Sequence, residues 1–355
     1  MTANFDAEPR SPAPRTAKTG RLGAAGRAAA LVLAAAVGAC APRIEPPGPP
    51  VAKPALGAET FVAADGMAAP VRRWLPDAGP VKASVIALHG FNDYSRFFQG
   101  AGLYLADRGY AVYAYDQRGF GRAGTPGLWP GTEALADDLK AVAGAVRARH
   151  PGRPSYLIGA SMGAAVIMVT MASADAPPVD GVVLSAPAVW GRATMALHQR
   201  AALWIAAHTL PWLKLTGQGL NIRASDNTDM LRALGRDPLV IKRTRIDAIW
   251  GLVELMDSAL ASSAALPGPT LILLGANDEV IPDKSFRDMV RRLAPTEGDR
   301  RRLAFYEGGW HMLLRDLQAE TVWADIAAWL DDTSAPLPSG ADARAAKLGA
   351  EVRGR

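Results

Sequence analysis

From Ala83 onward, short and almost uninterrupted apolar runs alternate with longer helix-forming stretches. The runs have the length of strands, and strands that are apolar on both sides are typical of a parallel sheet buried on both faces. The pattern therefore predicts an α/β fold with a mostly parallel central sheet and helices on both of its faces. The predicted strands span residues 84–88, 111–115, 154–158, 181–185, 270–274 and 302–306.

Two regions depart from this alternation. Residues 60–63 and 71–75 read as an antiparallel pair at one edge of the sheet, because a turn at Asp65-Gly66 separates them. Between 190 and 266 no strand pattern continues, and apolar and aromatic residues lie on predicted helices. We expect one domain over 58–332 with a helical cap at about 190–266, which either packs only on itself or also lines an acyl-chain site. The cap side chains in question are Trp190, Trp204, Trp212, Trp250, Leu203, Ile205, Leu210, Leu252, Leu255 and Met256.

A serine lies between glycines where the strand at 154–158 meets a largely apolar helix. The sequence there is Gly159-Ala160-Ser161-Met162-Gly163, which has the form G-x-S-x-G. In such a strand-turn-helix element the turn strains the serine backbone, and larger side chains at the glycines would collide with the neighbouring strand and helix. The pattern predicts an exposed, nucleophilic Ser161, and its alternative interpretation is a glycine-rich packing turn.

An acid and a histidine follow later strands, as a serine nucleophile requires. Asp278 comes after the strand at 270–274, and His311 comes after the strand at 302–306. A histidine base activates the serine hydroxyl, a carboxylate orients the histidine, and ligands of parallel sheets bind at the carboxyl ends of strands. Asp116 also follows a strand, but it precedes an Arg-Gly turn and is expected to hold that turn. Taken singly, His311 could be a core histidine and the acids simple loop carboxylates, namely Asp278, Glu279 and Asp283.

Several blocks together resemble serine α/β-hydrolases of the monoacylglycerol lipase and lysophospholipase group over roughly 81–330. The blocks are His89-Gly90-Phe91, Tyr115-Asp116-Gln117-Arg118-Gly119-Phe120-Gly121, Gly159-Ala160-Ser161-Met162-Gly163, Asp278 with Val280 and Pro282, and Gly309-Trp310-His311. Phe120 stands where the group more often has histidine, and Trp310 is bulkier than the usual neighbour of the catalytic histidine. The second departure bears on substrate size rather than on the chemistry.

The resemblance implies a role for each matching residue. Ser161 would be the nucleophile, His311 the base and Asp278 the acid, and the backbone N–H groups of Phe91 and Met162 would form the oxyanion hole. Apart from the resemblance, His89 is interpreted as a structural residue that orients its loop. The implied fold is the α/β-hydrolase fold with a helical cap insertion, and the implied reaction is hydrolysis of a carboxylic ester of a single-chain lipid through an acyl-enzyme.

Charge and motif content exclude several other classes of protein. The net charge is +5, but residues 1–39 contribute +3 and residues 333–355 contribute +2, so 40–332 is neutral overall. A neutral domain has no footprint for nucleic acid. No cluster of His, Asp and Glu has metal-ligand spacing, and no nucleotide-binding glycine motif follows a strand, so we expect no metal and no cofactor.

The first 39 residues are predicted to be a lipoprotein-type signal peptide. A basic stretch precedes an apolar run at 28–37, which is too short to span a bilayer. Val37-Gly38-Ala39-Cys40 resembles the lipobox of bacterial lipoproteins, and Cys40 is the sole cysteine. We therefore expect export to the bacterial cell envelope and a membrane anchor at lipidated Cys40. The alternative is an alanine-rich helix with an incidental cysteine.

The segments that flank the domain are expected to lack a core of their own. Five prolines in residues 42–50 predict that 40–57 is an extended tether. Residues 333–355 have few large apolar groups and read as a disordered tail or a loose helix. The same catalytic residues could also serve a small-ester carboxylesterase, a thioesterase or an acyltransferase, and an idle triad in a lipid-binding envelope protein is the alternative outside the enzymes. The oligomeric state is left open.

Overall fold

The computed structural model describes residues 41–293 and 300–346. Its sheet has nine strands in the order β1-β2-β3-β5-β4-β6-β7-β10-β11. The pairs β1–β2, β2–β3 and β3–β5 are antiparallel. All neighbouring strands from β5 to β11 in this order are parallel, which confirms the predicted α/β fold. The strands are β1 Ala55–Leu56, β2 Thr60–Val62, β3 Ala68–Trp74, β4 Ala83–Leu88, β5 Tyr110–Tyr115, β6 Ser155–Ala160, β7 Gly181–Ser185, β10 Thr270–Gly275 and β11 Arg301–Tyr306.

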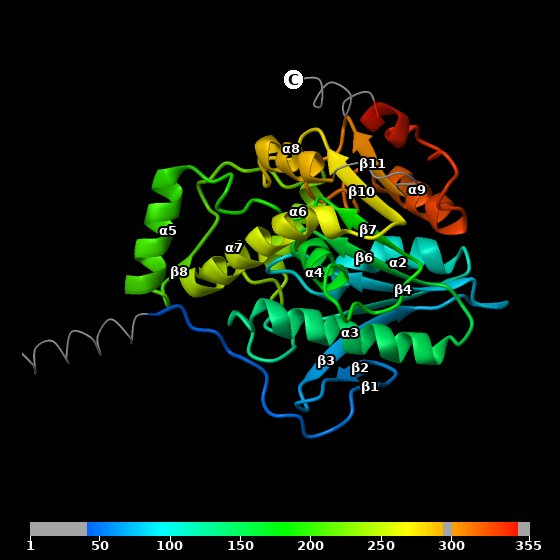
Figure 1. The fold of residues 1–355 in the computed structure, drawn as a ribbon, viewed down its shortest axis with the longest axis horizontal. Coiled ribbons are helices and arrows are strands. Elements are labelled where there is room, and N and C mark those ends of the chain that lie inside the picture. The colour runs from blue at the N-terminus through cyan, green and yellow to red at the C-terminus, as the bar shows by residue number, and fades with distance from the viewer. Residues whose placement is uncertain (1–40, 294–299, 347–355) are drawn as a thin grey trace, which may run out of the picture. The chain divides into compact units, whose positions relative to one another are not determined.

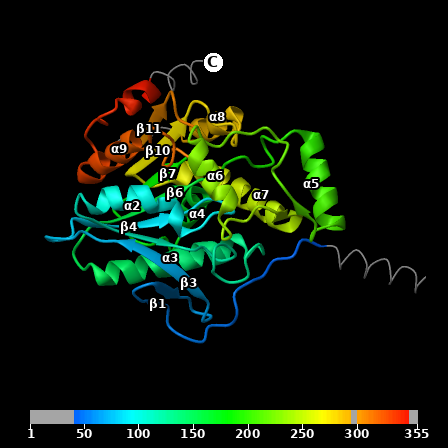
Figure 2. The same ribbon diagram turned by 180° about the vertical axis from the view of Figure 1, so that it is seen from behind.

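Helices cover both faces of the sheet because each central strand is apolar on both sides (Figure 1). On β4, Ile86 and Leu88 enter one core, whereas Val85 and Ala87 enter the other. The first core lies under α3, α4, α7 and α8, and the second lies under α2 and α9. Figure 2 shows the same helices from behind. These helices are α2 Gln99–Ala106, α3 Thr132–Arg149, α4 Met162–Met171, α7 Ile246–Ala261, α8 Asp283–Arg292 and α9 Ala319–Asp331.

The region between β7 and β10 is helical, as the pattern predicted. It contains α5 Leu197–Thr209, α6 Thr228–Arg236, α7, the short pair β8 Lys214–Leu215 and β9 Thr244–Arg245, and the 3-10 turn η2 Ser262–Ala265. Its aromatic and apolar residues do not share one core. Leu255 and Met256 of α7 are buried against the sheet's own helices, whereas Trp204 and Trp212 are 55% and 51% exposed. The outer part of the cap therefore presents apolar side chains to solvent.

The proline-rich segment after Cys40 is extended, as expected, but it lies along the domain instead of standing clear of it. The Glu45 backbone N–H donates to the Trp129 carbonyl (2.8 Å), and the Val51 N–H donates to the Ala64 carbonyl (2.8 Å). β1 then adds an edge strand, so the folded domain begins before residue 58. Backbone groups make these contacts, and side-chain patterning does not report them. Cys40 and the predicted signal peptide lie outside the described residues.

The segment after α9 also packs on the domain over 333–346, which differs from the expected disordered tail. Leu337 and Ala341 are buried in the core under α9. The Arg302 guanidinium donates to the carbonyls of Thr333 (3.1 Å) and Ser334 (2.8 Å), so the chain is tied to β11. In residues 41–293 and 300–346, no helix combines the length and the apolar character needed to cross a bilayer.

Candidate active site

Ser161 occupies a strained turn between β6 and α4. Its backbone has φ 52° and ψ −114°, a region that few residues other than glycine adopt. The Ser161 N–H donates to the Ser185 carbonyl (2.9 Å), and the Ser161 carbonyl accepts from the Ala188 N–H (3.1 Å). These bonds to the chain leaving β7 hold the strained conformation in place.

The flanking glycines are required for the steric reason that the sequence suggested. A Cβ at position 159 would lie 2.5 Å from the backbone nitrogen of Ala164 in α4. A Cβ at position 163 would lie 2.2 Å from the carbonyl oxygen of Leu88 at the end of β4. Both neighbours are backbone atoms, so neither can move aside as a flexible side chain would. Strand, turn and helix thus approach each other more closely here than any larger residue permits.

Asp278 and His311 form a buried pair. His311 Nδ1 donates to Asp278 Oδ2 (2.8 Å), and the two side chains are 9% and 2% exposed. The other carboxylate oxygen, Oδ1, accepts from the N–H groups of Val280 (2.8 Å) and Ile281 (2.9 Å). Because an ionised carboxylate only accepts, the His311 proton must be on Nδ1, which leaves the Nε2 lone pair available to take a proton.

The loop after β4 lies directly beside Ser161. A Cβ at Gly90 would be 3.4 Å from Ser161 Cβ. Phe91 follows, and its ring packs edge-on against Phe120 (5.5 Å between centroids) and against Trp129 (6.3 Å). Phe120 thus supports this loop with an apolar ring. Met162 follows Ser161 at the first position of α4, and Phe91 follows Gly90, whose backbone lies beside Ser161; the oxyanion role of Phe91 and Met162 stays a prediction.

His89 is a structural residue that orients this loop, as expected. It is fully buried, its Nδ1 donates to the Gly90 carbonyl (2.8 Å), and its Nε2 accepts from the Gln117 N–H (3.0 Å). Burial lowers the pKa of His89 below its ordinary value. The imidazole is therefore neutral, and it links the loop after β4 to the loop after β5.

Among the described residues, the other acidic residues that follow strands make no hydrogen bond to His311; they make other hydrogen bonds or lie at the surface. Asp116 accepts from the Ser95 N–H (3.0 Å) with one oxygen and from the Arg122 N–H (3.0 Å) with the other, so it holds the turn as predicted. Glu279 accepts from the Arg223 N–H (2.7 Å), and Asp283 lies at the exposed start of α8. In the part of the chain that the structure describes, no group of three or more His, Cys, Asp or Glu residues could hold a metal ion.

The cap is hydrogen-bonded to the loop after β4 and to the loop that carries His311. On the loop after β4, Asn92 donates its side-chain amide to Thr244 Oγ1 (2.7 Å), and its carbonyl accepts from the Ile241 N–H (2.9 Å). On the loop that carries His311, the Met312 N–H donates to the Ala224 carbonyl (2.9 Å). The cap therefore lies against loops at the carboxyl edge of the sheet.

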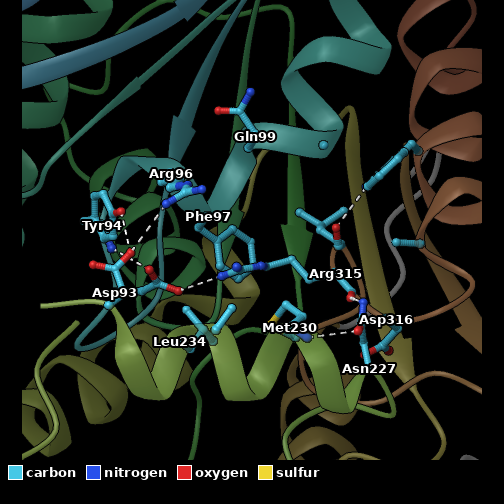
Figure 3. Close-up of a pocket in the computed structure, with 16 residues that line it drawn as sticks. Asp93, Tyr94, Arg96, Phe97, Gln99, Asn227, Met230, Leu234, Arg315 and Asp316 are labelled. Carbon is cyan, nitrogen blue, oxygen red and sulfur yellow. Dashed lines mark hydrogen bonds and ion pairs between the residues drawn. The ribbon is translucent and has the colours of Figure 1, made fainter. Parts of the chain in front are cut away.

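A pocket of about 350 Å³ opens behind these loops, between α6, the start of α2 and residues 314–323 (Figure 3). Arg315 Nη1 donates to Asp93 Oδ2 (3.2 Å) across it, which joins the loop before α2 to the loop after His311. Burial raises the pKa of Asp93 and lowers that of Arg315. Sequence reasoning did not single out this pair or Asp316. The available signal was the charged dipeptide Arg315-Asp316 directly after the apolar run that follows His311.

A mostly parallel sheet with a strained serine at a strand-to-helix turn and a carboxylate-bound histidine defines a serine hydrolase of the α/β-hydrolase fold. The chain matches the family described as serine aminopeptidase, S33, over residues 79–318, and it belongs to that family. Within this fold, the relatives and structural neighbours are lipases and esterases, and the chain is an ester-hydrolysing enzyme.

Monoacylglycerol lipases are among the most similar proteins. The chain is 24% identical to the monoacylglycerol lipase of Mycolicibacterium smegmatis over 72% of its own length and 90% of the relative's length. It is 26% identical to human monoglyceride lipase over 78% and 90% of the two lengths. A solved structure of a soluble variant of the Saccharomyces cerevisiae monoglyceride lipase has the same fold, with a TM-score of 0.64 and 20% identity over 82% and 99% of the two chains.

Proposed function

We propose that the protein hydrolyses single-chain lipid esters, such as monoacylglycerols or lysophospholipids, through an acyl-enzyme on Ser161. The observation that carries the chemistry is the strained Ser161 elbow on a domain that also holds the buried Asp278–His311 pair. A strained elbow is maintained only where the surroundings determine it, and such strain is common at catalytic nucleophiles.

The proposed reaction uses each atom in a defined way. Ser161 Oγ attacks the ester carbonyl while its proton passes to His311 Nε2, and Asp278 stabilises the imidazolium that forms. The backbone N–H groups of Phe91 and Met162 stabilise the oxyanion, and loss of one such donor typically costs about 3 kcal/mol of transition-state stabilisation. The ester C–O bond breaks as the leaving alcohol takes the proton from His311. A water molecule then releases the fatty acid by the same steps.

The outer face of the cap supports a lipid substrate. Soluble proteins rarely gather exposed large apolar side chains in one region unless that region binds a partner, a ligand or a membrane. α5 and the segment after it expose such side chains, and Figure 1 shows α5 at the outer side of the cap. The names of the curated relatives also agree with this substrate class. The exposed side chains are Leu197, Trp204, Ile205, Leu210, Trp212, Leu213, Leu215, Leu220 and Ile222.

A hydrolysis panel tests the substrate class. The protein starting at Ala41, which keeps the Glu45–Trp129 contact, is assayed with short-chain aryl esters, monoacylglycerols, lysophospholipids and acyl thioesters. We expect monoacylglycerols or lysophospholipids to have the highest kcat/KM, and Ser161→Ala to lower every rate by at least about 10⁴-fold. Preference for small esters or thioesters, or transfer to an added alcohol, would favour the corresponding alternative enzyme. Failure of a fluorophosphonate to label the folded protein at Ser161 would favour an idle triad.

We also propose export and anchoring through lipidated Cys40. The support is the sequence alone: a basic stretch, a short apolar run and Val37-Gly38-Ala39-Cys40. We expect wild-type protein expressed in a bacterium to sediment with membranes after cleavage, and Cys40→Ser to accumulate uncleaved. A Cys40→Ser protein found in membranes at the normal mature size would contradict the lipobox, and the alternative of an alanine-rich helix with an incidental cysteine would then stand.

A further inference from the structure

One short cap segment, residues 223–227, is bound to the loop that carries His311 at several points. Besides the Ala224 carbonyl that accepts from Met312, the side-chain amide of Asn227 donates to the Arg315 carbonyl (3.1 Å). The Asp226 carboxylate accepts from the Leu317 N–H (2.9 Å). The loop after His311 is thus paired with the cap along its length, although about 90 residues of sequence separate the two segments.

Asp316 links this cap segment to the residue before His311. One of its oxygens accepts from the Ser225 hydroxyl (2.6 Å), and the other accepts from the Trp310 backbone N–H (2.8 Å). Asp316 and Ser225 are 3% and 0% exposed, so water does not compete for these bonds. Asn227, Arg315 and Asp316 lie together at one end of the pocket in Figure 3. The Asp316 carboxylate thus holds the backbone directly before His311. The Ser225 hydroxyl of the cap holds that carboxylate in turn.

The same cap segment also reaches the loop that carries Asp278. The Arg223 backbone N–H donates to the carboxylate of Glu279 (2.7 Å), the residue directly after Asp278. The Arg223 guanidinium lies over the Trp310 ring, 4.6 Å from its centroid, which is a cation–π contact. Both members of the Asp278–His311 pair therefore have a direct neighbour in contact with residues 223–227.

We propose that Ser225 and Asp316 are positioning residues that transmit the position of the cap to the imidazole of His311. The inference rests on the proposed role of His311 as base and acid. When residues 223–227 are in place, Asp316 holds the Trp310 N–H and the imidazole is aligned for proton transfer. When the cap shifts, Asp316 loses one of its two partners and the alignment relaxes. The cap then controls turnover as well as access for the substrate.

This role has a chemical signature, because His311 acts differently on different leaving groups. An alkoxide leaving group, such as that of a glycerol ester, needs a proton from His311 as the C–O bond breaks. A nitrophenolate leaves readily without that proton, so misalignment of His311 harms the alkyl ester more than the aryl ester. A purely structural loss would lower the fraction of active enzyme and reduce both rates by the same factor.

The test compares glycerol monobutyrate with 4-nitrophenyl butyrate, which share one acyl group, and normalises rates by fluorophosphonate titration of Ser161. We expect Asp316→Ala to lower kcat/KM, which reports the acylation step, about 10- to 100-fold for the glycerol ester, with a several-fold smaller loss on the aryl ester. Ser225→Ala, which removes a single hydroxyl, should shift the ratio of the two rates in the same direction. Asp316→Asn keeps an oxygen for Trp310 and an amide for Ser225, and should restore the ratio.

Ser258→Ala is the matched control. Ser258 lies on the exposed side of α7, and in the described residues its hydroxyl bonds the Glu254 carbonyl, so its removal should leave the ratio unchanged. An unchanged ratio in both Ser225→Ala and titrated Asp316→Ala overturns the proposal, as does a ratio in Asp316→Asn equal to that in Asp316→Ala. If Asp316→Ala does not fold, Ser225→Ala against Ser258→Ala decides. Wild-type protein that hydrolyses neither ester would instead refute the proposed function, which separates the two failures.

Discussion

The sheet around Ser161 and the outer part of the cap differ in almost every physical respect. Every residue of β4 and β6 is buried, and so is most of α4. In α5 only Ala207 is buried, whereas Leu197, Trp204 and Ile205 are more than half exposed. The sheet determines where the reacting groups stand through close packing. The cap has little core of its own at its outer side, so that part can vary without disturbing the chemistry.

The inner edge of the cap differs from both the sheet and the outer part of the cap, because polar contacts attach it to the rest of the domain. Residues 223–227 and 241–244 bind the loop that carries His311 and the loop after β4 through hydrogen bonds, each of which contributes about 1 kcal/mol. Such an attachment holds the cap in place yet can open without unfolding the sheet. The comparison thus predicts that substitutions in the sheet have large effects on stability or activity. Substitutions on the cap should have moderate effects, and substitutions of groups that only orient the loops should have small ones.

The largest effect is expected for Gly163→Ala. The new Cβ would lie 2.2 Å from the Leu88 carbonyl oxygen, and β4 cannot move aside. We expect a loss of at least about 3 kcal/mol in the free energy of unfolding, or failure to fold. Gly144→Ala is the matched control, because a Cβ at this exposed position of α3 meets nothing within 4 Å, and the variant should gain about 0.5–1 kcal/mol in the free energy of unfolding. Urea denaturation measures both, and equal midpoints would contradict the packing argument.

The contrast between the sheet and the cap also explains which features could be predicted from the sequence. Strands such as β4 and β6 were predictable because burial on both faces requires unbroken apolar runs. Ser161, Asp278 and His311 could be singled out because the chemistry requires their residue types and the α/β-hydrolase fold places them after strands in that order, and their catalytic roles stay a prediction. The structure brings Asp278 and His311 into contact, and it confirms the glycine sterics beside Ser161.

Contacts without a pattern could not be predicted. Asp316, Ser225 and the Asp93–Arg315 pair are joined across long stretches of chain, and single polar residues have no periodicity that would reveal a partner. The docking of residues 41–54 uses backbone groups, which every residue possesses, together with two isolated side-chain contacts, Gly48 to Asp65 and Thr125 to Glu45. The exposure of Trp204 could not be predicted either. The residue type of an apolar side chain on a predicted helix does not show whether that side chain faces a core or the surface.

A moderate effect is expected on the outer cap. Ile205→Gln with Trp212→Gln removes two large apolar side chains that are about half exposed, so the free energy of unfolding should change by less than about 1 kcal/mol. Burial of apolar surface in a lipid interface contributes about 25 cal/mol per Å², so hydrolysis of a monoacylglycerol in vesicles should fall about tenfold. Hydrolysis of 4-nitrophenyl acetate in solution is the control for the chemistry. A parallel loss on both substrates would argue against a lipid-facing role.

The smallest effect is expected on the pH dependence of the free energy of unfolding, through His89 in the loop beside Ser161. His89 is neutral in the folded protein because burial lowers its pKa, whereas in the unfolded chain it titrates near its ordinary pKa of about 6.5. Below that pH the unfolded state binds one more proton, so stability is full above about pH 6.5 and falls with decreasing pH by up to about 1.4 kcal/mol per unit. His89→Gln cannot take up that proton and should show a shallower loss between pH 7.5 and 5.5 in urea denaturation. His150, whose pKa burial also lowers, is present in both proteins and cancels, so equal slopes would mean that His89 is not the neutral link between the two loops.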